Sequence, residues 1–127
     1  MTAPVEIVVD LPFPPSVNRL WEHTRNGIHL SIVYRKWIAD ANRLGLSQRV
    51  GRHRGRIAGP FRARILLNRN FRRADIDNLF KAALDWAQRV ELIANDRHNE
   101  GGSYDWVAPA EAPHGCRLIL TADIPKS

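Results

Sequence analysis

The chain has 127 residues, enough for one domain with a buried core, and its apolar fraction of 44% and charged fraction of 25% exclude a largely disordered protein. Its formal net charge is +6, and the positive side chains are sixteen arginines and only three lysines. Cys116 is the only cysteine, which excludes an intrachain disulfide and a zinc site built on cysteines, and no stretch approaches the roughly 20 apolar residues of a membrane span.

The first predicted element is a strand from Val5 to Leu11. Apolar residues alternate along it, so one face is expected to carry Val5, Ile7, Val9 and Leu11. Three prolines, at positions 12, 14 and 15, end the strand because proline has no N–H to donate to a sheet. The segment 16–30 shows no clear period, and we expect it to be irregular.

A helix is predicted next, with Ser31 as its N-cap and its end near Leu44, and with Gly45 just past that end. The residues predicted to face the core are Val33, Trp37, Ala41 and Leu44. The following segment, 46–60, interleaves glycines with arginines and has no apolar period. We therefore expect a long basic loop outside the core.

The second half of the chain predicts a strand, a helix and two further strands. Residues 61–67 alternate, with Phe61, Ala63, Ile65 and Leu67 inward and Arg62 and Arg64 outward. The helix is predicted over 77–90, with an apolar stripe of Leu79, Ala83, Trp86, Ala87 and Val90. Segments 103–107 and 116–121 are the last predicted strands, with Cys116 a small core residue. This βαβαββ order predicts a single α+β domain over residues 1–127, with one mixed sheet and two helices.

A basic field occupies the middle of the chain. From Ala41 to Ala74 there are ten arginines and neither Asp nor Glu. Such a field attracts polyanions and speeds their encounter, which favours nucleic acid as a partner. A solubilising surface in an arginine-rich proteome is the alternative explanation.

The run Asp75-Ile76-Asp77-Asn78-Leu79-Phe80-Lys81 follows this field directly. Carboxylates repel phosphate, but they hold hard divalent cations, which bind and activate phosphate. Residues two apart diverge within a helix, so the two aspartates converge only if Asp75 closes the strand and Asp77 opens the helix. An Asp77 that serves only as an N-cap is the alternative, and it leaves Asp75 without a role.

Asp96 is the best candidate for a third carboxylate. The predicted helix 77–90 is about 20 Å long, and the six residues 91–96 span about 20 Å when extended. The chain can therefore double back and bring Asp96 near Asp77. An ordinary turn residue within Asn95-Asp96-Arg97 is the alternative.

Lys81 lies one turn after Asp77 on the same helical face. Its compact charge suits a phosphoryl oxygen or an attacking water, and it is a lysine in a chain that otherwise uses arginine. A surface ion pair with Asp77 or Asp85 is the alternative, and such pairs contribute little.

Taken in order, these motifs resemble the RusA family of Holliday junction resolvases of bacteria and their phages. The opening Leu11-Pro12-Phe13-Pro14-Pro15-Ser16-Val17-Asn18-Arg19 is similar to the family's N-terminal signature, and so is His29-Leu30-Ser31 before the first helix. The run 75–81 resembles the catalytic motif, and Asn95-Asp96 occupies the place of an acidic pair. The resemblance covers roughly residues 5–123.

The resemblance implies a small homodimer that binds four-way DNA junctions with Mg²⁺, or Mn²⁺ in its place, and cuts them symmetrically. It implies three essential aspartates that hold the metal, Asp75, Asp77 and Asp96, and an essential lysine, Lys81. The family's acidic pair is Asp-Asp, whereas here its first member is Asn95. If that first member helps to bind metal, affinity is lower in this chain.

DNA contacts are expected from basic residues that hold phosphates and read junction shape rather than sequence. The expected contacts are Arg62, Arg64, Arg69, Arg72, Arg73, Asn18, Arg19, Arg52, Arg54 and Arg56. The enzyme is expected in the cytoplasm, with no membrane partner and no nucleotide cofactor, because no glycine-rich nucleotide loop is present. Two other functions stay open: a non-catalytic nucleic-acid-binding module, and a metal nuclease for other branched or single-stranded DNA. The carboxylate cluster is the discriminating feature, since binding alone does not require it.

Overall fold

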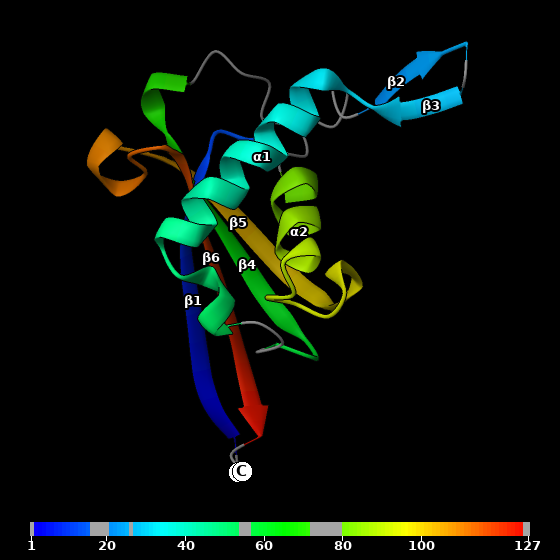
Figure 1. The fold of residues 1–127 in the computed structure, drawn as a ribbon. Helices are drawn as coiled ribbons and strands as arrows, with labels where there is room; N and C mark the ends of the chain where they lie inside the picture. The colour runs from blue at the N-terminus through cyan, green and yellow to red at the C-terminus, as the bar shows by residue number, and fades with distance from the viewer. Residues whose placement is uncertain (1, 16–20, 26, 54–56, 72–79, 126–127) are drawn as a thin grey trace.

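The computed structural model describes residues 2–15, 21–25, 27–53, 57–71 and 80–125. Its centre is a mixed four-stranded sheet with the order β1–β6–β4–β5, in which β4 and β5 are parallel and β6 is antiparallel to both of its neighbours. The strands are β1 (Thr2–Pro12), β4 (Phe61–Asn68), β5 (Asn99–Val107) and β6 (Gly115–Pro125). Together with the helices α1 (Ile32–Ser47) and α2 (Phe80–Arg89), they form the predicted α+β fold (Figure 1).

Alternating burial in β1 and β4 confirms the predicted strand faces. Val5, Ile7, Val9 and Leu11 are buried in β1, as are the alternate residues Phe61, Ala63, Ile65 and Leu67 in β4. The register pairs Ile7 with Leu120, Val9 with Leu118 and Leu11 with Cys116, so β6 continues the same apolar layer. Burial raises the pKa of the Cys116 thiol, and the residue lies fully inside the core, as predicted.

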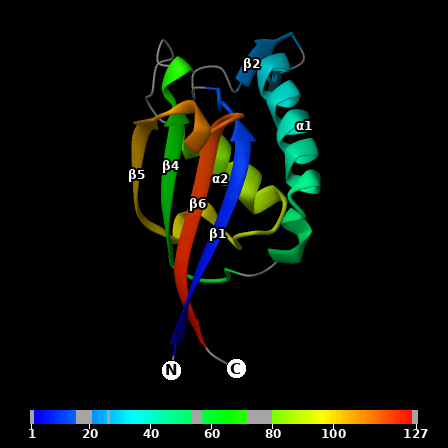
Figure 2. The ribbon, with the colours of Figure 1, turned by 90° about the vertical axis from the view of Figure 1, so that its left-hand side faces the viewer.

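The helices cover only one side of the sheet. In Figure 2 the sheet lies in front, α2 lies behind it and α1 runs along the β1 side. The residues of the opposite side, here named the outer face, include Glu6, Val8 and Asp10 on β1, Arg62 and Arg64 on β4, and Arg117, Ile119 and Thr121 on β6. Only η5 (Pro109–Glu111), a short 3-10 helix at the upper end, lies in front of it in the described part of the chain.

Helix α1 begins where it was predicted, but a different set of residues faces the core. Ser31 is the N-cap, and its Oγ accepts a hydrogen bond from the Tyr34 N–H at 3.0 Å. The buried residues are Tyr34, Trp37, Ala41 and Gly45, whereas Val33 is 49% exposed. The prediction of Val33 as a core residue was therefore wrong, and so was the end near Leu44, because the helix continues through Gly45 to Ser47.

Helix α2 packs through small side chains. Its buried residues are Ala82, Ala83, Leu84, Trp86 and Ala87. Trp86 donates from its indole Nε1 to Asn42 Oδ1 at 2.9 Å, and its ring lies 3.0 Å from the point where a Cβ on Gly45 would stand. Gly45 is therefore the place where α1 makes room for the largest side chain of α2. Leu79 lies outside the described residues.

Two stretches that were predicted to be irregular have regular structure or buried residues. Residues 21–30 contain a β-hairpin of β2 (Trp21–Thr24) and β3 (Gly27–Leu30). In the segment 46–60, Val50 and Ile57 are buried, and Ile57 forms a β-bridge with Ile93. The prediction that this segment stays outside the core was wrong, because two isolated apolar residues do not form a period and still reach the core.

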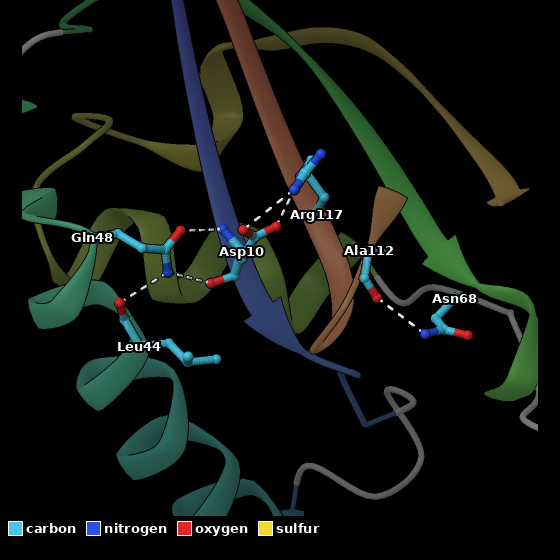
Figure 3. Close-up of polar contacts among 6 residues, drawn as sticks. All are labelled: Asp10, Leu44, Gln48, Asn68, Ala112 and Arg117. Atoms are coloured by element: carbon cyan, nitrogen blue, oxygen red, sulfur yellow. Dashed lines mark hydrogen bonds and ion pairs between the residues drawn. The ribbon is translucent and has the colours of Figure 1, made fainter. Parts of the chain in front are cut away.

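Polar contacts fix the end of α1 to β1, as Figure 3 shows. Gln48 accepts from the Asp10 N–H at 2.6 Å and donates to the Asp10 carbonyl at 2.8 Å, in the way a neighbouring strand would. The Asp10 carboxylate accepts from Arg117 at 2.8 Å, which joins β1 to β6. Near η5, Asn68 donates to the Ala112 carbonyl at 3.1 Å. None of the described helices has the length and apolar character needed to cross a membrane.

Candidate functional site

Lys81 and Asp96, two of the four predicted site residues, lie side by side. Lys81 is the second residue of α2, and its Nζ lies 3.8 Å from Asp96 Oδ2 and 3.1 Å from Asp85 Oδ1. The three side chains are partly exposed, with accessible fractions of 40% for Lys81, 30% for Asp96 and 21% for Asp85. An ammonium and two carboxylates therefore meet at a surface that a ligand can reach.

The chain between α2 and Asp96 is folded back by specific contacts. Glu91 takes a positive φ of 64°, and the Leu92 N–H donates to the Ala87 carbonyl at 2.9 Å, which reverses the chain at the end of the helix. Ile93 is then held in the core through its bridge to Ile57. The Asp96 N–H donates to Gln88 Oε1 at 3.0 Å, so the backbone of Asp96 is attached to α2 itself.

Asn95, the departure from the acidic pair, has a local structural role. It is the N-cap of η4 (Asp96–His98), and its Oδ1 accepts from the Arg97 N–H at 2.9 Å. An aspartate would accept the same hydrogen bond, because Asn and Asp are equally good at this position. The Asn95 side chain thus orients the turn that carries Asp96.

Asp85 and Tyr34 belong to the same cluster, and the sequence did not single them out as site residues. The Tyr34 hydroxyl donates to Asp85 Oδ2 at 3.3 Å, and Tyr34 is fully buried between the helices. Burial and, next, the negative charge of Asp85 raise the pKa of Tyr34 to about 12. Val33 and Tyr34 both lie at helical spacing from Trp37 and Ala41, so the periodicity of the sequence does not choose between them.

His98 is the last residue of η4, two positions after Asp96. Its Nδ1 is buried and has no hydrogen-bond partner in the described part of the chain. The five histidines show no paired spacing in the sequence, so no pattern pointed to this one.

The predicted metal ligands Asp75 and Asp77 lie outside the described residues, as do Arg72, Arg73, Asn18, Arg19, Arg54 and Arg56. Within the described ranges, no group of three or more His, Cys, Asp or Glu side chains gathers as a metal site would require. A three-carboxylate site therefore depends on Asp75 and Asp77, which precede Phe80, the first residue of α2. The carboxylate of Asp96 is a hard oxygen donor of the kind that Mg²⁺ prefers, and it is partly accessible.

The described arginines of the predicted DNA surface come from different elements of the fold. Arg62 and Arg64 project from the outer face, away from α2, and Arg64 pairs with Asp105 at 3.0 Å. Arg69 is exposed in η3 (Arg69–Phe71), directly after β4 and just before the undescribed segment 72–79. Arg52 is exposed in η2 (Val50–His53). The structure therefore does not bring Arg62 and Arg64 together with Lys81.

No protein-family model matches the sequence, and a search of curated proteins finds no match either.

Proposed function

We propose that this protein is a Mg²⁺-dependent endodeoxyribonuclease of the RusA type, which resolves four-way DNA junctions by paired phosphodiester hydrolysis in recombination and repair. The observation that supports it most is the 3.8 Å approach of Lys81 Nζ to Asp96 Oδ2. Lys81 belongs to the motif 75–81, and Asp96, fifteen positions further along the chain, belongs to the motif Asn95-Asp96. A nuclease site of this type requires the two side chains to be neighbours. If the similarity of these motifs to the family were accidental, nothing would require the two side chains to approach each other.

In this proposal Asp75, Asp77 and Asp96 hold the cation, which supplies Lewis-acid catalysis for attack on a phosphodiester. Lys81 stabilises the negative charge that develops on the phosphoryl oxygens. Asp85 accepts from Lys81 at 3.1 Å and holds the ammonium at the mouth of the site. The Tyr34 hydroxyl donates to the second oxygen of Asp85, which fixes that carboxylate in turn.

The decisive experiment is cleavage of a synthetic four-way junction with Mg²⁺ by the wild type, Asp77→Asn and Lys81→Ala. We expect the wild type to produce paired symmetric incisions and each variant to lose at least about a hundredfold in cleavage rate while it still binds the junction, because a lost charge-stabilising group costs about 10²–10³ in rate. The matched control is Asp40→Asn, since Asp40 pairs with Arg43 on α1 and lies outside the proposed site.

Other outcomes would contradict the proposal at different points. A wild type that binds the junction but never cuts it would indicate a non-catalytic nucleic-acid-binding module. Equal cutting of flaps and single strands would indicate a metal nuclease without junction selectivity. Normal cleavage by Asp77→Asn would leave the enzyme class standing and overturn the site.

A further inference from the structure

Three aromatic side chains from three separate parts of the chain form a stack. Phe13 follows β1, Phe71 ends η3, and Trp106 belongs to β5. The centroid of the Phe13 ring lies 5.0 Å from that of Phe71, with the two ring planes 8° apart. It lies 6.1 Å from the Trp106 ring, with the planes 15° apart. Near-parallel rings at these separations are offset-stacked pairs, and Phe13 belongs to both of them.

This aromatic stack is anchored in the core and reaches the surface at Phe71. Phe13 and Trp106 are partly buried and pack against the core, whereas Phe71 is 44% exposed. An exposed ring that is already held parallel to its neighbour offers a flat apolar surface. A further planar ring packs favourably on such a surface.

The backbone that carries Phe71 is fixed by a buried amide. Asn68 is 4% exposed, and its Oδ1 accepts a hydrogen bond from the Asn70 N–H at 2.9 Å. Its Nδ2 donates to the Ala112 carbonyl at 3.1 Å, so one side chain ties η3 to the loop after η5. A ring that is held in place before binding loses little conformational freedom when a ligand covers it.

The charges beside the exposed ring favour a nucleic acid as the ligand. Arg69 and Asn70, which share η3 with Phe71, are both exposed. The stretch from Ala41 to Ala74 that contains them has ten arginines and neither Asp nor Glu. Proteins bind single strands of nucleic acid through positive side chains that follow the phosphates and aromatic rings that stack on the bases. An arginine and an exposed ring two positions apart supply both parts.

We propose that Phe71 stacks on an unpaired base of the DNA strand bound at the nuclease site, and that Phe13 and Trp106 hold its ring in position. The identity of the ligand as DNA rests on the proposed function. Stacking on an aromatic ring tolerates any base, because every base has a π-face. Phe71 therefore suits an enzyme that reads the shape of its substrate rather than the sequence.

The stack lies within reach of Lys81. Residues two apart on a strand share a face, so Trp106 lies on the same face of β5 as Gly102. A Cβ on Gly102 would stand 3.0 Å from the ring of Phe80, the residue before Lys81. The four residues from Gly102 to Trp106 span about 13 Å, and four steps along a DNA strand, at about 3.4 Å each, span a similar length. A strand with a phosphate at Lys81 therefore brings a base a few nucleotides away onto Phe71.

The first test is the affinity for a short single-stranded oligothymidylate, measured by fluorescence anisotropy in EDTA so that no strand is cut. Phe71→Leu keeps an apolar side chain but removes the ring, and it should weaken binding about fivefold or more. Phe71→Tyr keeps the ring and should stay within about twofold of the wild type. Leu46→Ala is the control for loss of an exposed apolar side chain, because Leu46 is 80% exposed on α1, and it should also stay within about twofold.

The second test locates the contact directly. Ultraviolet light joins a thymine covalently to an aromatic ring on which it is stacked, and mass spectrometry of the crosslinked wild type should place that thymine on Phe71. Equal affinities of Phe71→Leu and the wild type, or crosslinks at other residues with none at Phe71, would overturn the proposal.

The results separate this inference from the proposed function. Junction cleavage by a wild type that gives no crosslink at Phe71 would leave the nuclease standing and remove the stacking role. A crosslink at Phe71 in a protein that cuts no junction would support the stacking role and contradict the nuclease. A wild type that binds neither the single strand nor the junction would overturn both.

Discussion

Lys81, Asp85 and Tyr34 form a chain of contacts that joins the surface of the candidate site to the core. The Lys81 ammonium and the Tyr34 hydroxyl use different oxygens of Asp85, at 3.1 Å and 3.3 Å. Tyr34 comes from α1 and the other two residues from α2, so the position of Lys81 depends on how the helices pack. A partly buried carboxylate with both oxygens bound has little freedom to turn.

The raised pKa of Tyr34 predicts a stability change in alkali. The neutral phenol is favoured in the folded protein, so its contribution is complete below the unfolded pKa of about 10 and is lost as pH rises toward the folded pKa of about 12. Compared with Tyr34→Phe, the wild type should be more stable by about 1 kcal/mol at pH 8 and less stable by about 1 kcal/mol at pH 12, a change on the order of 2 kcal/mol that falls mainly between pH 10 and 12. Urea unfolding of both proteins at several pH values measures this.

The control for this prediction is Tyr104→Phe, because Tyr104 is 46% exposed. Its difference from the wild type should stay within about 0.5 kcal/mol and change little with pH. A difference between the wild type and Tyr34→Phe that does not change from pH 8 to 12 would contradict the buried, Asp85-bound state of the hydroxyl.

Among the secondary-structure elements, the close approach of β5 to the start of α2 matters most for the site. A Cβ on Gly102 would stand 2.8 Å from the Ala63 carbonyl oxygen and 3.0 Å from the Phe80 ring. Phe80 is the residue before Lys81, so the missing side chain at position 102 allows the first turn of α2 to lie against the sheet.

Gly102→Ala should therefore destabilise the protein by about 1–3 kcal/mol, the usual cost of adding a methyl group to a packed contact. Gly59→Ala is the matched control, because nothing lies within 4 Å of its added Cβ, and its effect should stay within about 0.5 kcal/mol. Midpoints of urea unfolding give both values. Equal stability of the two variants would show that β5 and α2 are not in close contact at this point.

The strands and the caps were predictable because their signals are local. Alternation in residues 5–11 and 61–67 and the hydroxyl of Ser31 each act within a few residues of the chain. The buried face of α1 was predicted wrongly because Val33 and Tyr34 are both apolar enough to face the core. The contact that distinguishes them joins Tyr34 to Asp85, 51 positions further along the chain. The hairpin 21–30 and the buried Ile57 likewise depend on tertiary packing.

In the candidate site, the approach of Asp96 to the start of the second helix is the one contact that was predicted from the sequence. The length of the return segment allowed Asp96 to approach the start of the helix, and it lies beside Lys81. Which face of the sheet Arg62 and Arg64 occupy followed from alternation, but their separation from Lys81 required knowing which face the helices cover. The assignment of Asp75 and Asp77 remains a prediction.

At the scale of the whole molecule, the two helices cover one face of the sheet, and the described residues leave most of the other face uncovered (Figure 2). An uncovered sheet face is common in water, so exposure alone indicates no partner. The outer face carries charges of both signs, and two of its arginines are already paired within the chain, Arg64 with Asp105 and Arg117 with Asp10.

The proposed function predicts how a junction is cut. If one binding event delivers two incisions, a cruciform extruded from a supercoiled plasmid becomes a linear molecule. An enzyme that cuts one strand at a time gives mainly nicked circles instead, because the released supercoiling reabsorbs the cruciform and the second cut is lost. Agarose gels separate the two products, and Asp40→Asn should behave like the wild type, since Asp40 pairs with Arg43 outside the proposed site. Nicked circles as the main product of the wild type would contradict paired hydrolysis.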